Sequence, residues 1–577
     1  MRFSELKTKL PIGCQSFAQL INRGKVYVDK TAYVYELAVN DSPQILTRPR
    51  RFGKSTLLTT LEALFRYGVK PDADGKPSLF HGLAIEQLWQ DEETYPVLRL
   101  NLHRLNSNCD TAAQFEQNLM RAVANFCDEQ KIDLTAQINS KLVAMVVSEP
   151  LRFNDLFSYM LDQMNRPLVL LVDEFDAPLI YHYDQKQELK ECKLIMRGLF
   201  NTVKDYPDKF RCVLFTGITR FQDLDLGTAG NSFTDVSYDG EFAACCGYTR
   251  AELEHYFPEY LRYAAAVRNG CSLEAVSDKQ IERLLNEMSF WYDSYSFDGS
   301  EQNRVFSTWS VLRFFANKES VLDAYWSTEE GAGLPQLLKL VLERIKLNEL
   351  IAELGQIVIG GKEFLQSSLI NPKANPYSLL FQTGYLTFAE PFRPSGKAHL
   401  TCPNQEIRWA FANLLVRHFY NFNYDLCSTE SSSKMLAALA SIDPEQIRIA
   451  INEAIGILPY SHSPENEFWV AGLMILFLFG LNLKPRAEVM SLNGRADCVF
   501  DLPGHNITFV FEFKYEASAD DNALDAKLAE ALQQIKSRKY ALDGNSESRV
   551  ARLGLVFCAA PGERGFARVE LADVIAR

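Results

Sequence analysis

Between Tyr27 and about Tyr260, short and continuous apolar runs alternate with stretches of helical periodicity. The runs include "SPQILTR", "YPVLRLNL", "PLVLLVDEF" and "KFRCVLFTGITR". Strands that are apolar at every position, instead of every second one, are covered on both faces, as in parallel α/β sheets. We therefore predict that the first part of the chain is a parallel sheet enclosed by helices.

The first apolar run leads directly into "RPRRFGKSTLLTTLEALFRYG". Its segment Phe52-Gly53-Lys54-Ser55 matches the end of the phosphate-loop pattern G-x-x-x-x-G-K-[ST], although Arg48 stands where the first glycine belongs. In such a loop, backbone N–H groups and a helix N-terminus face the phosphates. The three letters GKS recur by chance, but a strand before them and a helix after them supply the context that the motif requires.

Each residue of the loop then has an expected role. Gly53 allows the backbone to approach the phosphates, Lys54 binds the β- and γ-phosphates, and Ser55 is a ligand of Mg²⁺. Thr56 follows them into the helix and is included in the predicted ATP site.

An acidic pair ends the strand-like run "PLVLLVDEFDAPL". We predict that Asp173 holds Mg²⁺ through water and that Glu174 orients or deprotonates the attacking water. A buried strand with acidic residues at its exposed end is the alternative, and the phosphate loop upstream favours the catalytic interpretation.

The run "VLFTGITRF" is expected to carry a polar sensor of the γ-phosphate at its end. Thr216 is the first candidate, followed by Thr219 and Arg220, and Arg220 is also the candidate arginine finger. Any of the three could instead be an ordinary turn residue.

A second constellation lies in "GRADCVFDLPGHNITFVFEFKYE". Two strands joined by a turn at Pro503 and Gly504 would place Asp497 beside Glu512, with Lys514 on the same face. Two carboxylates can hold Mg²⁺ or Mn²⁺, and a lysine can position or activate the hydrolytic water. The D…E-x-K spacing is weak alone, since an exposed charged strand pair would explain it. The apolar run "ITFVF" indicates burial, where charges require partners or a metal.

The sequence also resembles a known family. "LPIGCQSFAQLINRGKVYVDKTAYVYEL" and "RPRRFGKST" are similar to AAA-ATPase-like proteins with a C-terminal PD-(D/E)xK nuclease-like domain, and the similarity continues in "VDEFDAPL", "FTGITRF", "FWYDSYSF", "LLFQTGYLTF" and "GRADCVF". The family loop reads R-P-R-R-F-G-K-S, so the resemblance implies that Arg48 is normal there. One departure is "STWS", beginning at Ser307, where the family usually has N-P-W-S.

The resemblance implies further site residues. Arg50 and Arg51 would add guanidinium groups near the phosphates. Glu467, at the head of an apolar helix, would join the metal shell. Gln534 would contact a phosphate or the water, although a solvent-facing glutamine is an equal alternative. In "YVDKT", a residue would pack by the adenine, or Asp29 would simply cap a helix.

Composition sets the outer limits. A net charge of −13 disfavours wholesale nucleic-acid binding, so such binding would need a local basic face. The 12 cysteines are scattered without zinc spacing, which favours reduced thiols in a cytoplasmic protein. "FWVAGLMILFLFGLNL" is shorter than the roughly 20 residues of a membrane span and is expected to be a buried helix, with no membrane partner.

The predicted fold class is α/β with three parts. They are a P-loop ATPase domain (1–260), a helical lid with a winged-helix-like region (261–454), and a PD-(D/E)xK nuclease-like domain (455–577). The expected function is ATP binding and hydrolysis coupled to Mg²⁺-dependent cleavage of DNA or RNA, in defence or repair, by a monomer or homo-oligomer. The alternative is an ATP-dependent switch or scaffold whose nuclease-like domain binds without cleaving.

Overall fold

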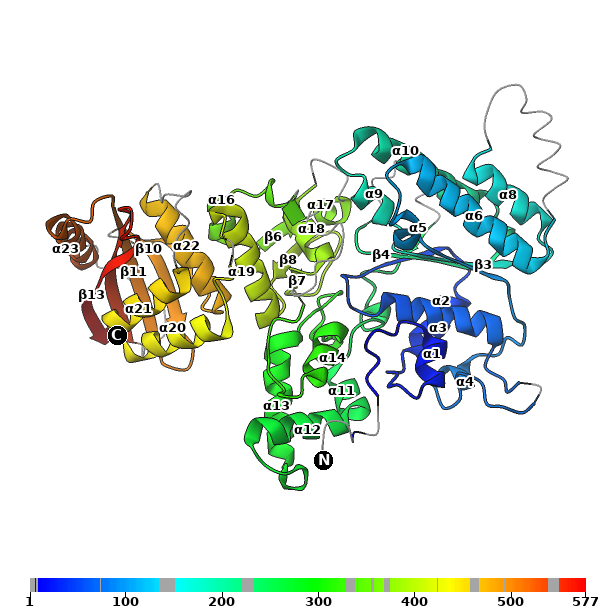
Figure 1. Cartoon of the computed structure of the whole chain (residues 1–577), viewed down its shortest axis with the longest axis horizontal. Helices are drawn as coiled ribbons and strands as arrows, with labels where there is room; N and C mark the ends of the chain where they lie inside the picture. Colours follow the sequence, from blue (N-terminus) through cyan, green and yellow to red (C-terminus); the bar gives the residue numbers. More distant parts are fainter. Residues whose placement is uncertain are drawn as a thin grey trace. The chain divides into compact units, whose positions relative to one another are not determined.

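The computed structural model describes residues 6, 9–72, 74–133, 151–220, 233–326, 338, 339, 341–353, 357–367, 374–422, 424–456, 466–491, 494–537 and 549–576. The chain divides into two compact units (Figure 1). The first consists mainly of Met1–Leu322 and Ile359–Leu400, and the second mainly of Leu338–Val358 and Thr401–Arg577. Each unit is described by itself.

The first unit is built on a five-stranded parallel sheet with the order β2-β3-β4-β1-β5. Its strands are β1 (Gln44–Thr47), β2 (Val97–Asn101), β3 (Leu168–Asp173), β4 (Phe210–Gly217) and β5 (Thr234–Asp235). Every residue of β1 and β3 is buried, as the continuous apolar runs predicted. The parallel α/β sheet is therefore confirmed, although the two-residue β5 was not foreseen.

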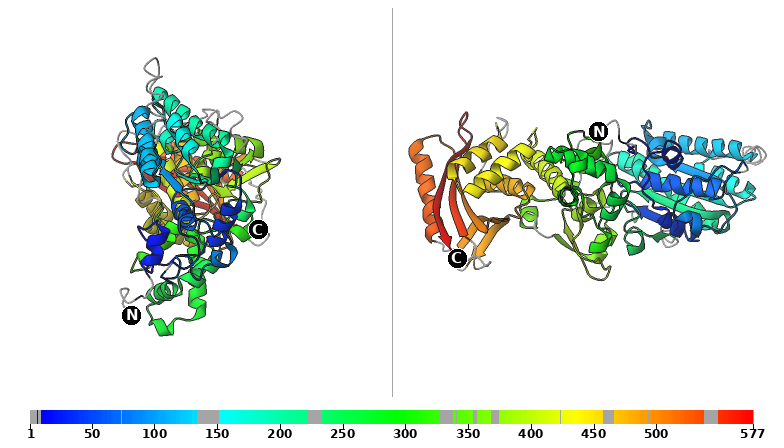
Figure 2. Two further views of the ribbon diagram at one scale, coloured as in Figure 1. Left: turned by 90° about the vertical axis from the view of Figure 1, so that its right-hand side faces the viewer. Right: turned by 90° about the horizontal axis from the view of Figure 1, so that it is seen from below.

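Helices cover both faces of this sheet (Figures 1 and 2). On one face, α6, α8 and α10 bury Phe115, Phe157 and Leu199 against β2, β3 and β4. On the other face, α2 contacts β4, and α3 contacts β2 and β3. The helices of this part are α1 (Phe17–Asn22), α2 (Thr31–Val39), α3 (Lys54–Tyr67), α4 (Ile85–Leu88), α5 (Leu102–Asn106), α6 (Ala112–Gln130), α8 (Phe153–Gln163), α9 (Ala177–Tyr181) and α10 (Lys186–Asp205).

A helical part follows the sheet, as predicted. Its helices are α11 (Arg250–Tyr256), α12 (Pro258–Asn269), α13 (Asp278–Tyr292) and α14 (Thr308–Ala316). A winged-helix-like order comes next: β6 (Ile357–Gly360), α17 (Gly361–Gln366), α18 (Pro376–Thr383), β7 (Thr387–Phe388) and β8 (Lys397–Thr401), with strand order β6-β8-β7. Phe364, Phe381 and Phe388 surround Tyr238, which joins this part to the segment after β5.

The second unit contains a mixed sheet with the order β13-β12-β11-β10-β9. Its elements are α16 (Leu347–Glu353), α19 (Gln405–Tyr420), α20 (Thr429–Ser441), α21 (Pro444–Ile455), α22 (Glu467–Gly480), β9 (Arg486–Ser491), β10 (Gly494–Leu502), β11 (Ile507–Glu516), α23 (Asp521–Ser537), β12 (Arg549–Cys558) and β13 (Gly565–Ala576). Strands β10 and β11 are the two strands predicted on either side of the turn at Pro503 and Gly504, and β9, β12 and β13 complete the sheet.

Helices also cover both faces of the second sheet (Figures 1 and 2). On one face, α23 approaches closely because Gly554 of β12 has no side chain: a Cβ there would lie 3.1 Å from the Cβ of Ala531. On the other face, Trp469 of α22 lies against Phe557. Helix α22 is the apolar segment of the sequence analysis, and Val470 to Gly480 are almost entirely buried in it. Among the described residues, no helix has both the length and the apolar character to cross a bilayer.

The domain boundaries predicted at 260 and 454 remain predictions. The second compact unit includes α19, α20 and α21 together with the mixed sheet. Asn452 of α21 ties this helical segment to the sheet, because its side chain donates to the Phe566 carbonyl (3.0 Å) and accepts from the Phe566 N–H (2.8 Å).

Candidate functional site

The phosphate loop connects the end of β1 to the start of α3. Gly53 is the N-cap of α3 and has φ +95°, a left-handed conformation that glycine adopts without strain. Lys54 is buried, and its Nζ donates to the carbonyl oxygens of Arg48 (2.8 Å) and Pro49 (2.9 Å). Burial lowers the pKa of Lys54. The ammonium therefore lies across the loop, on the carbonyls of its first two residues.

Arg48, the residue in the place of the usual glycine, is a structural cation. Its side chain is 1% exposed and donates to the carbonyl oxygens of Thr47 (2.9 Å), Ser237 (2.6 Å) and Phe242 (2.8 Å). The guanidinium also lies over the Phe297 ring, 4.2 Å from its centroid. Arg48 therefore ties the loop to the segment after β5 through bonds to backbone carbonyls.

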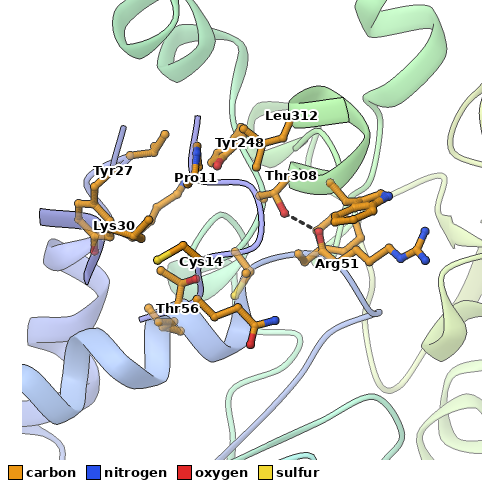
Figure 3. A pocket seen from close by; sticks show the side chains of 18 of the residues that line it. Pro11, Cys14, Tyr27, Lys30, Arg51, Thr56, Tyr248, Thr308 and Leu312 are labelled. Carbon is orange, nitrogen blue, oxygen red and sulfur yellow. Dashed lines mark hydrogen bonds between the residues drawn. The ribbon is translucent and has the colours of Figure 1, made fainter. Parts of the chain in front are cut away.

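Two motifs of unknown role in the sequence support the loop. From "FWYDSYSF", Tyr295 and Phe297 pack edge-on against Phe52, with ring centroids 4.7 and 5.5 Å away. From "STWS", the Thr308 hydroxyl donates to the Arg51 carbonyl oxygen, as Figure 3 shows. A proline at position 308, as in N-P-W-S, has no hydroxyl and could not make this bond. The departure from the family pattern thus provides an additional contact to the loop.

The acidic pair lies at the carboxyl end of β3. Asp173 is buried, and its Oδ1 accepts from the Thr216 hydroxyl at the end of β4 (2.8 Å), while Asn101 Nδ2 lies 3.5 Å from its Oδ2. Glu174 has φ +53°, an uncommon conformation that occurs preferentially at functional sites. Burial, and then the charge of Asp173, raise the pKa of Glu174. His103 lies with Nδ1 3.9 Å from Glu174 Oε2.

The other two sensor candidates are engaged in the structure. Thr219 donates through its N–H (2.7 Å) and hydroxyl (2.9 Å) to Asp176 Oδ2. Arg220 pairs with Asp235 (2.6 Å) and lies over the ring of Tyr238. Of the three candidates, Thr216 is the one in contact with Asp173.

The loop borders two cavities. A cavity of about 340 Å³ is lined by Arg51, Gly53 and Thr56 of the loop and helix α3 (Figure 3). The rest of its wall includes Pro11, Ile12, Tyr27, Val28, Lys30, Leu57, Tyr248 and Leu312. A smaller cavity of about 70 Å³ is lined by Arg50, His103, Glu174 and Tyr181, among others. The large cavity is mainly apolar and the small one contains the acidic residue.

In the "YVDKT" segment, one residue orders a helix start and two others line the large cavity. Asp29 Oδ1 accepts from the Thr31 N–H (2.8 Å) and hydroxyl (2.6 Å), and its Oδ2 accepts from the Ala84 N–H (2.8 Å), so Asp29 orders the start of α2. Tyr27 and Lys30, on either side of it in the chain, line the large cavity.

The residues at the loop suit a magnesium ion. Ser55 offers a hydroxyl at the start of α3, the helix that follows β1, and Asp173 offers a carboxylate at the end of β3. Strand β4 lies between β1 and β3 in the sheet. Both side chains are oxygen ligands, and Mg²⁺ in proteins is usually held by one or two such groups together with waters and substrate phosphates.

The second site lies on β10 and β11 of the second unit. Cys498 pairs with Phe511, which places Asp497 at the next position, beside Glu512. Asp497 Oδ2 accepts from the Phe513 N–H (2.8 Å). The predicted hairpin is therefore present, and its turn spans 503–506.

Lys514 lies between two carboxylates. Its Nζ is 3.5 Å from Glu512 Oε1 and 3.1 Å from Glu467 Oε1 at the head of α22, and it donates to the Phe513 carbonyl (2.9 Å). Glu512 is fully buried and Lys514 is 4% exposed. The structure thus brings together Asp497, Glu512, Lys514 and Glu467.

Gln534 lies in the last turn of helix α23 and is partly buried. No described contact joins it to the four residues above. Lys527, on the same helix, pairs with Glu530 (2.8 Å). Lys536 follows in the last turn of α23, and the next two basic residues of the sequence, Arg538 and Lys539, lie outside the described residues.

The carboxylates of the second site also suit Mg²⁺ or Mn²⁺, because both ions accept carboxylate oxygens. Within the described parts of the chain, no group of three or more histidine, cysteine, aspartate or glutamate side chains is arranged around a metal position. Water or substrate oxygens would therefore complete the shell at either site, as is usual for Mg²⁺.

Some residues of the site were not predicted from the sequence. Asn101, beside Asp173, is the last residue of β2, and His103, beside Glu174, lies in α5 directly after it. The polar residues at the end of "VLRLN" and just after it were the available signal, but the sequence does not show that β2 lies next to β3.

Both sites fall in segments that match known families. Residues 11–227 match the family model described as Predicted AAA-ATPase, and residues 465–566 match the one described as PD-(D/E)XK nuclease superfamily. The chain is also 25% identical over 548 residues to a protein of Azotobacter chroococcum mcd 1 described as "Uncharacterized protein in vnfD 5'region", and the similarity covers 93% of both chains. The chain therefore combines an AAA-ATPase-like domain with a PD-(D/E)XK nuclease-like domain, which confirms the resemblance.

Proposed function

We propose that the chain binds and hydrolyses ATP at the phosphate loop and that this reaction controls metal-dependent cleavage of nucleic acid at the second site. The observation that carries the proposal is the burial of Glu512 with Lys514 3.5 Å away on the same strand. Burying a charged group costs several kcal/mol per ion, and a pair of hydrophobic residues in the same place would not have this cost. The presence of Glu512 and Lys514 in an apolar sheet is typical of a catalytic site.

At the phosphate loop, the large cavity is proposed to hold the adenosine. Its volume of about 340 Å³ and its apolar wall suit a base and ribose, and Gly53 and Thr56 place the loop at its side. Lys54 would exchange its two loop carbonyls for phosphate oxygens. Mg²⁺, when bound by Ser55 and Asp173, would supply neutralisation of the phosphate charge.

Glu174 is proposed to take the proton of the attacking water. It lines the small cavity together with Arg50, which would face the terminal phosphate. Thr216, bonded to Asp173, would report the state of the γ-phosphate to β4.

At the second site, Asp497 and Glu512 are proposed as metal ligands, with the bound ion supplying charge neutralisation on a phosphodiester. Lys514 is proposed to orient the attacking water, because its ammonium lies between Glu512 and Glu467. Glu467 would hold that ammonium in position, and Gln534 would contact the substrate backbone. A role in defence or repair, acting on DNA or RNA, is part of the same proposal.

The test of the ATPase part is a steady-state phosphate-release assay on the full chain. Lys54→Ala should release no phosphate because it no longer binds ATP. Lys70 is an exposed lysine paired with Glu92, and Lys70→Ala should release phosphate at the wild-type rate. If Lys54→Ala hydrolyses ATP at the wild-type rate, the loop is not the ATPase site. ATP binding without turnover by wild type would support the switch interpretation in place of the enzyme.

A further inference from the structure

Two adjacent cysteines lie in the wall of the large cavity. Cys245 and Cys246 both line it, and their side chains are 2% and 3% exposed. Cys14 lines the same cavity from the N-terminal segment, as Figure 3 shows, and is more exposed. The cavity therefore contains a pair of neighbouring thiols and a third, separate thiol.

The turn that carries the pair is held on both sides by the phosphate loop. Before it, the Phe242 carbonyl accepts from Arg48 (2.8 Å), and after it, the Gly247 N–H donates to the Phe52 carbonyl (2.9 Å). Gly247 has φ +89°, and a Cβ there would lie 2.7 Å from the side chain of Val305, so the turn has little freedom to shift. A change at Cys245 and Cys246 would therefore be transmitted to Arg48 and Phe52.

Two cations lie beside the pair, and one of them, Lys30, also pairs with Glu252 (2.6 Å). Lys30 donates to the Ala244 carbonyl (2.8 Å), directly before Cys245, and Arg48 lies on the preceding side. Donation from the Cys246 thiol, and then the two cations, lower the pKa of Cys245 to about 7, and the same contact raises the pKa of Cys246. A thiolate is the form of cysteine that attacks disulfides, so Cys245 is the expected nucleophile.

We propose that Cys245 and Cys246 form a thiol-oxidation site that reacts with low-molecular-weight disulfides, and that its oxidised form excludes nucleotide from the cavity. The Cys245 thiolate attacks one sulfur of the reagent, forming a mixed disulfide and releasing one thiolate. The Cys246 thiolate then attacks the Cys245 sulfur, forming the Cys245–Cys246 bond and releasing the second thiolate. The two protein protons end on the two released thiols, and the reagent disulfide takes up the two electrons.

A disulfide between Cys245 and Cys246 would distort the turn that carries them and would be easily reduced. Adjacent Cα atoms lie about 3.8 Å apart across a trans peptide, below the roughly 4.4–6.8 Å of ordinary disulfides. The turn must distort to close the ring, and a strained disulfide is readily reduced. The distortion would move Phe242 and Gly247, which hold the phosphate loop through Arg48 and Phe52.

The experiment treats the full chain with oxidised glutathione and maps disulfides by non-reducing peptide mass spectrometry. Nucleotide affinity is measured in parallel with a fluorescent ATP analogue. We expect a Cys245–Cys246 disulfide, a loss of affinity of at least about tenfold, and recovery with dithiothreitol. Saturating Mg²⁺-ATP should slow formation of the disulfide. An oxidised protein that binds the analogue as tightly as the reduced one, or glutathione adducts without a Cys245–Cys246 bond, would overturn the inference.

Variants separate the pair from the third thiol. Cys14→Ser should remain sensitive to oxidation, whereas Cys245→Ser combined with Cys246→Ser should bind nucleotide equally before and after treatment. Protection of the wild type by ATP requires no variant and still tests the inference if the double variant does not fold. The inference rests on the proposed ATP site: reduced protein that binds no nucleotide contradicts that proposal, whereas equal binding by reduced and oxidised protein contradicts this one.

Discussion

At the scale of residues, the phosphate loop depends on a buried arginine whose guanidinium is bonded to backbone carbonyls. Arg48 supplies three hydrogen bonds to backbone carbonyls and a ring contact with Phe297. The sequence identified the loop but not this role, because the partners Ser237, Phe242 and Phe297 are distant in the chain. A pattern based on glycine spacing contains no information about such contacts.

Arg48→Gly restores the usual loop pattern, yet it should weaken the protein. Three buried carbonyls would lose a charged donor, and we expect a loss of roughly 2–4 kcal/mol in the free energy of unfolding, with weaker ATP binding. Chemical denaturation and nucleotide titration measure the two effects. Unchanged stability, or tighter ATP binding, would contradict the structural role assigned to Arg48.

Glu174→Gln should retain ATP binding and lose hydrolysis, because the amide cannot accept the proton of the attacking water. Glu92→Gln, an exposed glutamate far from the loop in sequence, is the matched control. Phosphate release should fall by on the order of 10²–10⁴-fold in Glu174→Gln and stay unchanged in the control. Full turnover by Glu174→Gln would remove it from the proposed mechanism.

We expect the stability of the protein to depend on pH through Asp293, the C-cap residue of helix α13. Burial raises its pKa to about 6, from 3.8. The folded state therefore favours the protonated form of Asp293. The stabilisation that this proton gives the folded state is complete below pH 3.8, the ordinary pKa of the group, and is lost as the pH rises through about 6. Asp293→Asn should therefore raise the free energy of unfolding at pH 7 by on the order of 2 kcal/mol and have little effect at low pH. An equal effect at both pH values would contradict this assignment.

At the scale of elements, strand order creates both candidate sites. Strand β4 lies between β1 and β3, so Thr216 at its end meets Asp173. The buried strands were predictable because their apolar runs are continuous. The short β5 and the outer strands β9 and β13 were not, because they lack that signal. Strand order itself depends on long-range pairing that residue patterns do not encode.

Helix α14 should report nucleotide binding. Trp309 lines the large cavity, and two guanidiniums lie near its ring, with Arg51 5.0 Å and Arg313 4.6 Å from the ring centroid. A nucleotide that recruits Arg51 should change the emission of Trp309. Titration with ATP should shift the fluorescence of wild type but not of Trp309→Phe. An identical shift in the variant would place the reporting tryptophan elsewhere.

At the scale of the whole molecule, the chain contains two sites with separate carboxylates in separate compact units. The sequence located both, since each is marked by short motifs: the phosphate loop and the acidic pair after an apolar strand at the first site, and the hairpin with D…E-x-K spacing at the second. The sequence did not show which other residues contact these site residues. An example is the ion pair between Glu467, at the head of α22, and Lys514 of β11.

Metal binding should separate the roles within the second site. Glu512→Ala should lose one Mn²⁺ site in calorimetric titration of the full chain, whereas Lys514→Ala should retain it and lose mainly cleavage rate. Lys527→Ala, which removes an exposed lysine of α23, is the matched control. Loss of Mn²⁺ binding in Lys514→Ala but not in Glu512→Ala would reverse the assignment.

The most direct test is the rate of cleavage of labelled single- and double-stranded DNA and RNA with Mg²⁺ or Mn²⁺ and saturating ATP. Wild type, Glu512→Ala and Lys54→Ala are compared as full chains. We expect cleavage by wild type, none by Glu512→Ala, and an altered rate for Lys54→Ala, in which the proposed ATP site is disabled. Indistinguishable results for wild type and Glu512→Ala on every substrate would contradict this expectation.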